Sequence, residues 1–201
     1  MATDRNVAQH EKLVGKSVQG LQPIFILGCE RTGTTALLSL LDSDNRFLVG
    51  RERFKFVCKE LSVNHFEPEH FLHPTLEETN FLDKNYYDRL KRRWENGTAS
   101  YICEKNPLYF RHLEHLRKEF PSARYIFTFR GLKRVAYTYN SRARNPEDKN
   151  WPINKDFRVA VKYWNQSLSS FRKFSFQTDA NRSFYIQYER FFSGDENYLA
   201  A

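Results

Sequence analysis

The chain has 201 residues, of which 40% are hydrophobic and 16% aromatic, and its 32 basic and 24 acidic side chains give a net charge of +8. This length predicts one domain, the apolar content excludes intrinsic disorder, and no apolar run approaches the length that spans a bilayer. We therefore expect a mobile polar lead-in over residues 1–20, a single domain over residues 21–201 that binds an anionic ligand, and no membrane partner.

Strand and helix patterns alternate along the chain. Short β-prone runs predict strands over residues 23–28, 100–103, 124–129 and 184–188. Helix-forming segments predict helices over residues 36–41, 83–95, 108–120, 133–143 and 157–171. The last helix has one apolar stripe, which we expect to be buried: Phe157, Val161, Trp164, Leu168 and Phe171. This alternation predicts the α/β class, a P-loop-like parallel sheet with helices on both faces and ligands at the carboxyl ends of its strands.

The cysteine pattern argues against a disulfide scaffold and a zinc site. The chain has three cysteines, Cys29, Cys58 and Cys103, which cannot all pair and show no CxxC spacing. We therefore expect a reducing, cytoplasmic compartment and no metal. We expect the charged run at residues 89–93 to be a solvated helix face, and the aromatic-rich segment 65–81 either lines a substrate site or is a packed loop.

A glycine-containing loop follows the first predicted strand. Gly28 and Gly33 stand five residues apart between a strand and a helix, the spacing of a phosphate-binding loop. Nucleotide hydrolases have Lys after the second glycine, whereas this chain has Thr34 there and carries its cation at Arg31. No predicted strand ends in the Asp that would hold Mg²⁺. The loop therefore predicts an anion site that suits a metal-bound triphosphate poorly; the alternative is a tight turn capped by Thr34 without a ligand.

A second group of cations follows the third predicted strand. Arg130 stands at the carboxyl end of that strand, and Arg134, Thr138 and Arg142 follow at steps of four on one helix face. No acidic residue occurs over residues 121–145, so we expect an anionic ligand to answer these cations. The alternative is a solvated basic face. Two anion sites at neighbouring strand ends favour a small ligand with phosphates at two places.

These two motifs resemble those of sulfotransferases that use 3′-phosphoadenosine 5′-phosphosulfate (PAPS). The run Arg31, Thr32, Gly33, Thr34 and Thr35 is similar to the 5′-phosphosulfate loop of that family. Arg130 with Thr138 eight residues later resembles its 3′-phosphate motif, with Thr in place of the usual Ser. Arg142 matches a position that supplements this contact in the tyrosylprotein branch, and Tyr188 resembles a tyrosine that lines the nucleotide pocket. The resemblance runs from about residue 23 to about residue 192.

The same resemblance implies a catalytic group. Lys105, in the segment Glu104-Lys105-Asn106-Pro107, is similar to the lysine that neutralises the transferring group in non-cytosolic and bacterial members. Glu52 resembles the general base of the tyrosylprotein branch and of bacterial relatives; its alternative is a surface carboxylate paired with a neighbouring Arg. His65 and His70 are rival candidates for the base, as in the cytosolic enzymes of the family. Arg31 and Lys105 would stabilise the sulfuryl oxygens and the leaving phosphate.

The resemblance thus implies sulfuryl transfer from PAPS, without a metal, to a hydroxyl or amine of a small-molecule, glycan or peptide acceptor. The chain ends soon after Tyr188, whereas family members commonly continue with a helix and a closing loop, so we expect either a compact member or a truncated copy with impaired activity. The alternatives are a P-loop nucleotide kinase, which would require Mg²⁺, and a non-enzymatic polyanion or nucleic-acid binder. Cations clustered at two strand ends favour a small ligand over nucleic acid.

Overall fold

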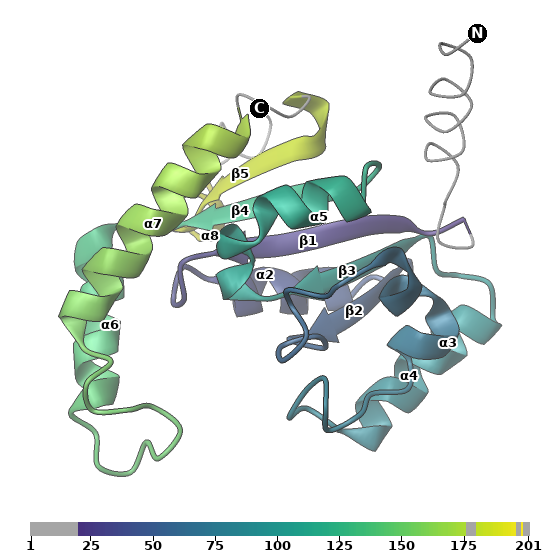
Figure 1. Cartoon of the computed structure of the whole chain (residues 1–201), viewed down its shortest axis with the longest axis horizontal. Helices are drawn as coiled ribbons and strands as arrows, with labels where there is room; N and C mark the ends of the chain where they lie inside the picture. Colours follow the sequence, from purple (N-terminus) through teal and green to yellow (C-terminus); the bar gives the residue numbers. More distant parts are fainter. Residues whose placement is uncertain (1–19, 176–179, 196–197, 199–201) are drawn as a thin grey trace, which may run out of the picture.

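A five-stranded sheet forms the centre of the computed structural model, which describes residues 20–175, 180–195 and 198. Its strands are β1 (Gln22–Gly28), β2 (Phe47–Arg51), β3 (Tyr101–Lys105), β4 (Arg124–Phe129) and β5 (Ser183–Gln187). Neighbouring strands pair in parallel in the order β2-β3-β1-β4-β5 (Figure 1). The chain crosses from one side of β1 to the other between β3 and β4, and such a reversal opens a crevice at the carboxyl ends of the strands. The predicted lead-in, apart from Gly20, lies outside the described residues.

Helices cover both faces of the sheet, as the alternation predicted. The α-helices are α2 (Thr34–Asp42), α3 (Pro68–Phe71), α4 (Lys84–Glu95), α5 (Leu113–Glu119), α6 (Leu132–Ala143), α7 (Phe157–Ser175) and α8 (Tyr188–Phe192). Three short 3₁₀ segments join them: η1 (Val63–Phe66), η2 (Pro107–Arg111) and η3 (Ala180–Arg182). No helix in the described part of the chain has the length and apolarity that would let it span a membrane.

The sequence of β1 explains the two-faced packing. Phe25 and Leu27 are fully buried on one face, in a core shared with α5 and α7 (Figure 1). Ile24 and Ile26 are buried on the opposite face, against Leu38 and the rest of α2. Because successive side chains of a strand point to opposite faces, a strand covered on both sides must be apolar throughout. Each fully buried side chain of this kind contributes about 1.5–3 kcal/mol to folding.

Most predicted elements are confirmed, with differences at their ends. The strand at residues 124–129 has the predicted bounds, and Asp83 caps α4 by accepting a hydrogen bond from the N–H of Tyr86. The predicted helix at residues 108–120 is divided by His112 into η2 and α5. The strand β3 continues to Lys105, two residues beyond the prediction, and β2 was not predicted. The extension of β3 matters, because it places Lys105 at the carboxyl edge of the sheet.

The buried stripe predicted for α7 was wrong at its amino-terminal end. Phe157 is 49% exposed and Val161 is 36% exposed. The fully buried positions of this helix are instead Ala160, Ser167 and Phe174, at steps of seven. Small side chains at the first two positions allow the helix to approach its neighbours closely. The apolar pattern therefore indicated the right helix, but its face is rotated from the one that the large side chains suggested.

The solvated basic face predicted at residues 89–93 was also wrong in part. Arg93 is only 8% exposed, and its guanidinium donates to the Asp42 carboxylate at 2.9 Å. Arg89 makes a second pair with the same carboxylate, with distances of 3.0 and 2.8 Å. Desolvation opposes the charge on Asp42, but these two arginines lower the pKa of its carboxyl below the usual range. The run thus holds α4 against the end of α2.

Candidate functional site

The loop between β1 and α2 is shaped by left-handed backbone and by one buried threonine. Gly33 has φ +100° and Arg31 has φ +69°, a region that favours glycine. The Thr32 hydroxyl donates to the Cys29 carbonyl at 2.6 Å and lies 2.8 Å from the Thr128 hydroxyl at the end of β4. Thr32 therefore ties the loop to the neighbouring strand, and its hydroxyl is already engaged within the protein.

The amino-terminal end of α2 presents backbone N–H groups that have no acceptor. Gly33 is the N-cap without a side-chain cap, and the first N–H of α2 to bond back is that of Leu37, which donates to the Gly33 carbonyl at 3.1 Å. The N–H groups of Gly33, Thr34 and Thr35 have no acceptor within the described residues. Such N–H groups, together with the positive end of the helix dipole, form an anion site. This is the place where the sequence predicted the phosphosulfate group.

Tyr188 joins the loop to the second predicted anion site. A Cβ atom on Gly33 would overlap the Tyr188 ring, so the ring lies directly against the loop backbone. The guanidinium carbon of Arg130 lies 4.4 Å from the centre of the same ring. Arg130 also donates to the Arg31 carbonyl at 3.4 Å, while its Nε is buried and has no partner in the described structure. Three predicted binding residues from distant parts of the sequence therefore form one wall.

The guanidinium groups of this region share one electrostatic environment. Desolvation lowers the pKa of Arg31, and the positive charges of Arg142 and Arg130 lower it further, against the opposing charge of Glu30. The Arg130 guanidinium also lies 3.4 Å from the carbonyl oxygen of Arg31. The cations predicted from two separate motifs are thus close enough to bind one anionic ligand together.

The second predicted group of cations was expected to have no acidic partner within the protein, and this was wrong for Arg142. Asp148, from the segment after α6, accepts hydrogen bonds from Arg142 at 2.5 and 3.0 Å. The Arg142 guanidinium also lies 4.3 Å from the Trp151 ring. Thr138 donates its hydroxyl to the Arg134 carbonyl at 2.9 Å, within its own helix. The partner was missed because Asp148 follows the acid-free segment by three residues and the chain turns back there.

Glu52 and Lys105, predicted from separate segments, are in direct contact. The Lys105 ammonium donates to a Glu52 carboxylate oxygen at 2.8 Å, and only 5% of Lys105 is exposed. Glu52 has φ +54°, and its N–H donates to the Lys105 carbonyl at 2.9 Å. The Thr79 hydroxyl donates a hydrogen bond to the Glu52 carbonyl oxygen at 2.9 Å. A non-glycine residue in this conformation costs about 1–3 kcal/mol, so the neighbouring strand and loop impose the position of this carboxylate.

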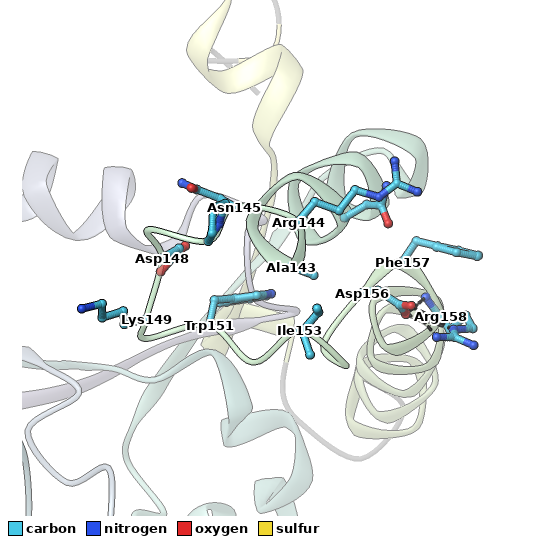
Figure 2. A pocket seen from close by; sticks show the side chains of 12 residues that line it. Ala143, Arg144, Asn145, Asp148, Lys149, Trp151, Ile153, Asp156, Phe157 and Arg158 are labelled. Carbon is cyan, nitrogen blue, oxygen red and sulfur yellow. Dashed lines mark hydrogen bonds and ion pairs between the residues drawn. The ribbon is translucent and has the colours of Figure 1, made fainter.

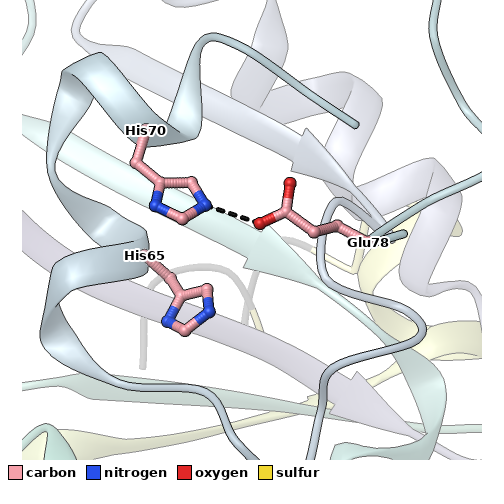
Figure 3. A group of neighbouring side chains, drawn as sticks. All are labelled: His65, His70 and Glu78. Atoms are coloured by element: carbon pink, nitrogen blue, oxygen red, sulfur yellow. Dashed lines mark hydrogen bonds and ion pairs between the residues drawn. The ribbon is translucent and has the colours of Figure 1, made fainter. Parts of the chain in front are cut away.

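The rival histidines form a separate cluster, shown in Figure 3. His70 Nε2 lies 2.5 Å from a carboxylate oxygen of Glu78, and the second oxygen of Glu78 accepts from Arg53 at 2.6 Å. His65 Nδ1 accepts from the backbone N–H of Ser62 at 3.1 Å. Nitrogen and oxygen atoms of this cluster lie within 4.8 Å of one another. Arg53, His70 and Thr75 all contact the Glu78 carboxylate, and the Ser62 N–H occupies Nδ1 of His65, so these contacts indicate a structural cluster.

A cavity of about 640 Å³ opens beside Glu52. Polar and apolar side chains from four parts of the chain line it: Glu30, Glu52, Lys55, Phe56, Val57, Cys58, Lys59, Glu60, Asn106, Pro107, Leu108, Arg111, His112, Arg142, Asn150, Trp151 and Lys155. Neither His65 nor His70 is among them. The aromatic-rich segment 65–81 also contributes nothing; Phe66 and Phe71 are fully buried in the core, so that segment is a packed loop.

The sequence patterns did not indicate two further residues that contact the predicted site, Glu30 and Lys155. Glu30, inside the loop, accepts from the Tyr139 hydroxyl at 2.8 Å and from the Lys155 ammonium at 2.7 Å. These contacts connect the loop between β1 and α2 to α6 and to the segment before α7. Lys155 also lies 4.1 Å from the Trp151 ring, at the wall of the cavity. No local pattern marks Lys155, because its partner is 125 residues away.

Glu104, next to Lys105, is fully buried. One of its carboxyl oxygens lies 3.3 Å from the Tyr109 hydroxyl and accepts from the Phe54 N–H at 3.4 Å. A Cβ on Gly50 would overlap the other oxygen, which has no partner in the described part of the chain. Burial raises the pKa of Glu104 to about 8. This carboxyl group therefore packs the Gly50–Phe54 turn, which carries Glu52, against β3.

Another cavity, of similar size, lies elsewhere. It has about 690 Å³ and is lined by the end of α6, the start of α7 and the segment between them (Figure 2). Trp151 and Asp148 belong to its wall, but none of the predicted site residues does. Volume therefore does not select between the two cavities. The cavity beside Glu52 is the one that predicted site residues line, namely Glu52 and Arg142.

Comparisons with known proteins agree with the geometry. A family model described as the sulfotransferase family matches residues 23–201. No curated protein matches the sequence significantly. The sulfotransferase domain of an olefin synthase from Synechococcus has a TM-score of 0.58 and 18% identity, over 90% of this chain and 71% of that one. A sulfotransferase from Mycobacterium tuberculosis has a TM-score of 0.59 and 17% identity, over 96% and 68%. At identities this low, the structural similarity shows a common fold and nothing more.

Proposed function

The chain belongs to the sulfotransferase family, and from this premise we propose that it transfers a sulfuryl group from PAPS to a hydroxyl or amine acceptor. One observation carries the choice of donor. The Tyr188 ring contacts both Gly33, at the start of α2 with its free N–H groups, and the Arg130 guanidinium. A donor with phosphates at both its 5′ and 3′ positions matches such a pair of sites.

The residues present fit this nucleotide. The N–H groups of Gly33, Thr34 and Thr35 would hold the 5′-phosphosulfate, with Arg31 beside them. Arg130, whose buried Nε lacks a partner in the described structure, would hold the 3′-phosphate with Thr138. Arg142 would join them on release from Asp148. An unpaired buried guanidinium nitrogen is costly, which favours an anion that completes its hydrogen bonds.

The chemistry that we propose is an in-line displacement. The acceptor oxygen or nitrogen forms a bond to sulfur while the bond from sulfur to the 5′-phosphate oxygen breaks, and 3′-phosphoadenosine 5′-phosphate (PAP) leaves. Glu52 takes the proton of the acceptor. Arg31 and Lys105 stabilise the sulfuryl oxygens and the leaving phosphate. A sulfuryl group carries less negative charge than a phosphoryl group, so fixed cations are sufficient for this role. The free thiols of Cys29, Cys58 and Cys103 are compatible with a cytoplasmic site of action.

Thermal shift tests the proposal with two nucleotides that differ in one group. PAP should stabilise the protein more than AMP does, because only PAP carries the 3′-phosphate. Arg130→Gln should remove this difference and lower PAP affinity roughly 10- to 100-fold, since a hydrogen bond to a charged group is worth about 1.5–3 kcal/mol. Arg172→Gln, which removes an exposed charge from α7, is the control and should preserve the difference in stabilisation between PAP and AMP. Equal stabilisation by PAP and AMP would contradict the proposal.

A further inference from the structure

The cavity beside Glu52 has an excess of cations. Five cationic side chains and three carboxylates line it. Two of the cations are neutralised within the protein: Arg142 pairs with Asp148, and Lys155 pairs with Glu30. Lys55 has a longer contact of 3.8 Å with Glu52. The remaining positive charge therefore lies on a different part of the wall.

That part of the wall is formed by Lys59, Arg111 and His112. Neither Lys59 nor Arg111 has an acidic partner among the described residues. Burial lowers the pKa of His112, and so do the positive charges of Lys59, His115 and Arg111. The three groups therefore lie near one another in a positive field. Glu60, which is exposed and lines the same cavity, offsets part of that charge.

The Arg111 guanidinium packs against aromatic rings. It has no acidic partner in the described part of the chain. Its central carbon lies 4.4 Å from the ring centre of Tyr163 in α7 and 5.5 Å from that of Phe110. Such contacts orient a guanidinium without using its hydrogen-bond donors. Both rings line a neighbouring cavity, and Arg111 borders that cavity as well as the one beside Glu52. A planar guanidinium with free donors matches the two oxygens of an acidic group. His112 is half-buried, and its ring has no hydrogen-bond partner within the described residues, so it offers a further donor.

We propose that the acceptor carries an acidic group in addition to its reacting hydroxyl or amine, and that Lys59, Arg111 and His112 bind this acidic group. The inference rests on the proposed function, because the cavity is an acceptor site only if Glu52 and Lys105 serve the transfer. Val57, Leu108 and Trp151 add apolar wall to the same cavity. The acceptor class is therefore a molecule with an apolar part, a nucleophile and a carboxylate, sulfate or phosphate group.

Equilibrium binding to the PAP-saturated protein tests this inference. The probes are 4-hydroxyphenylacetate and its uncharged amide, which differ only in the acidic group. The acid should bind at least about tenfold more tightly than the amide, which corresponds to about 1.4 kcal/mol, and the preference should decrease as salt is raised. Arg111→Gln and Lys59→Gln should each reduce the preference while PAP affinity stays unchanged. Arg172→Gln removes the same charge outside the cavity and should leave the preference intact.

The outcomes separate this inference from the proposed function. Equal binding of acid and amide, failure of the acid to bind, or an equal loss in the Arg172→Gln control would each overturn acidic-acceptor recognition. PAP binding that does not depend on the 3′-phosphate would contradict the proposed donor, whatever the probes show. Normal PAP binding together with no preference for the acid would leave the proposed transfer standing and reject this inference alone.

Discussion

Replacing Gly33 with Ala would perturb the contact that joins the two halves of the proposed nucleotide site. The new Cβ would overlap the Tyr188 ring, which also stacks on Arg130. Gly33 has φ +100°, a conformation that costs an alanine about 1–3 kcal/mol. Crowding of the ring adds about 1–3 kcal/mol, because overpacking of a tight contact has a cost of that size. We therefore expect Gly33→Ala to lower the free energy of unfolding by about 2–6 kcal/mol, and PAP affinity to fall as Tyr188 and Arg130 shift.

A double-mutant cycle separates the two contributions. Urea unfolding would be measured for the wild type, Gly33→Ala, Tyr188→Ala and the double variant. In the Tyr188→Ala background the ring is absent, so Gly33→Ala should retain only the cost of the backbone conformation, about 1–3 kcal/mol. The double variant should not recover PAP affinity, because the stacking surface is lost. If Gly33→Ala costs as much without the ring as with it, the packing of Tyr188 against the loop is not the cause.

Three further changes address other parts of the site. Asp148→Asn should strengthen binding of PAP but not of AMP, as isothermal titration would show, because it frees Arg142; an equal gain for AMP would argue against a 3′-phosphate role for Arg142. Glu52→Gln should lower turnover by about 10²- to 10⁴-fold and leave PAP affinity intact in the same titration; undiminished turnover would assign the base elsewhere. For Glu104, burial raises the pKa of the carboxyl from 4.5 to about 8. Between these values the folded state holds a proton that the unfolded state releases, so the free energy of unfolding falls as pH rises. Denaturant unfolding at pH 5 and pH 8 should show this slope in the wild type and a flatter one in Glu104→Gln, and equal slopes would contradict the assignment.

Local patterns were sufficient for most of the helices and strands and for the residue types of the predicted site. The strand at residues 124–129 and the loop with glycines at 28 and 33 could be predicted from the sequence, because β-propensity and glycine spacing are short-range properties. The pairing of Glu52 with Lys105 follows from topology, since β2 and β3 are neighbours and their carboxyl ends meet. The resemblance to one family supplied the roles that spacing alone left open.

Long-range partners were beyond local patterns. Asp148 neutralises Arg142 only because the chain turns back after α6, and Lys155 reaches Glu30 across 125 residues. Arg93 was predicted to be solvated, but it pairs with Asp42 at the end of α2. A run of charged residues does not by itself reveal a partner on a distant helix. Each of these is an ion pair whose members lie on different elements, so only the assembled fold brings them together.

A crystal structure of the protein with PAP bound tests the central claim most directly. We expect the 5′-phosphate within hydrogen-bond distance of the N–H groups of Gly33, Thr34 and Thr35, and the 3′-phosphate against Arg130 and Thr138. A nucleotide seated in the cavity between α6 and α7, or one whose 3′-phosphate faces solvent, would contradict it.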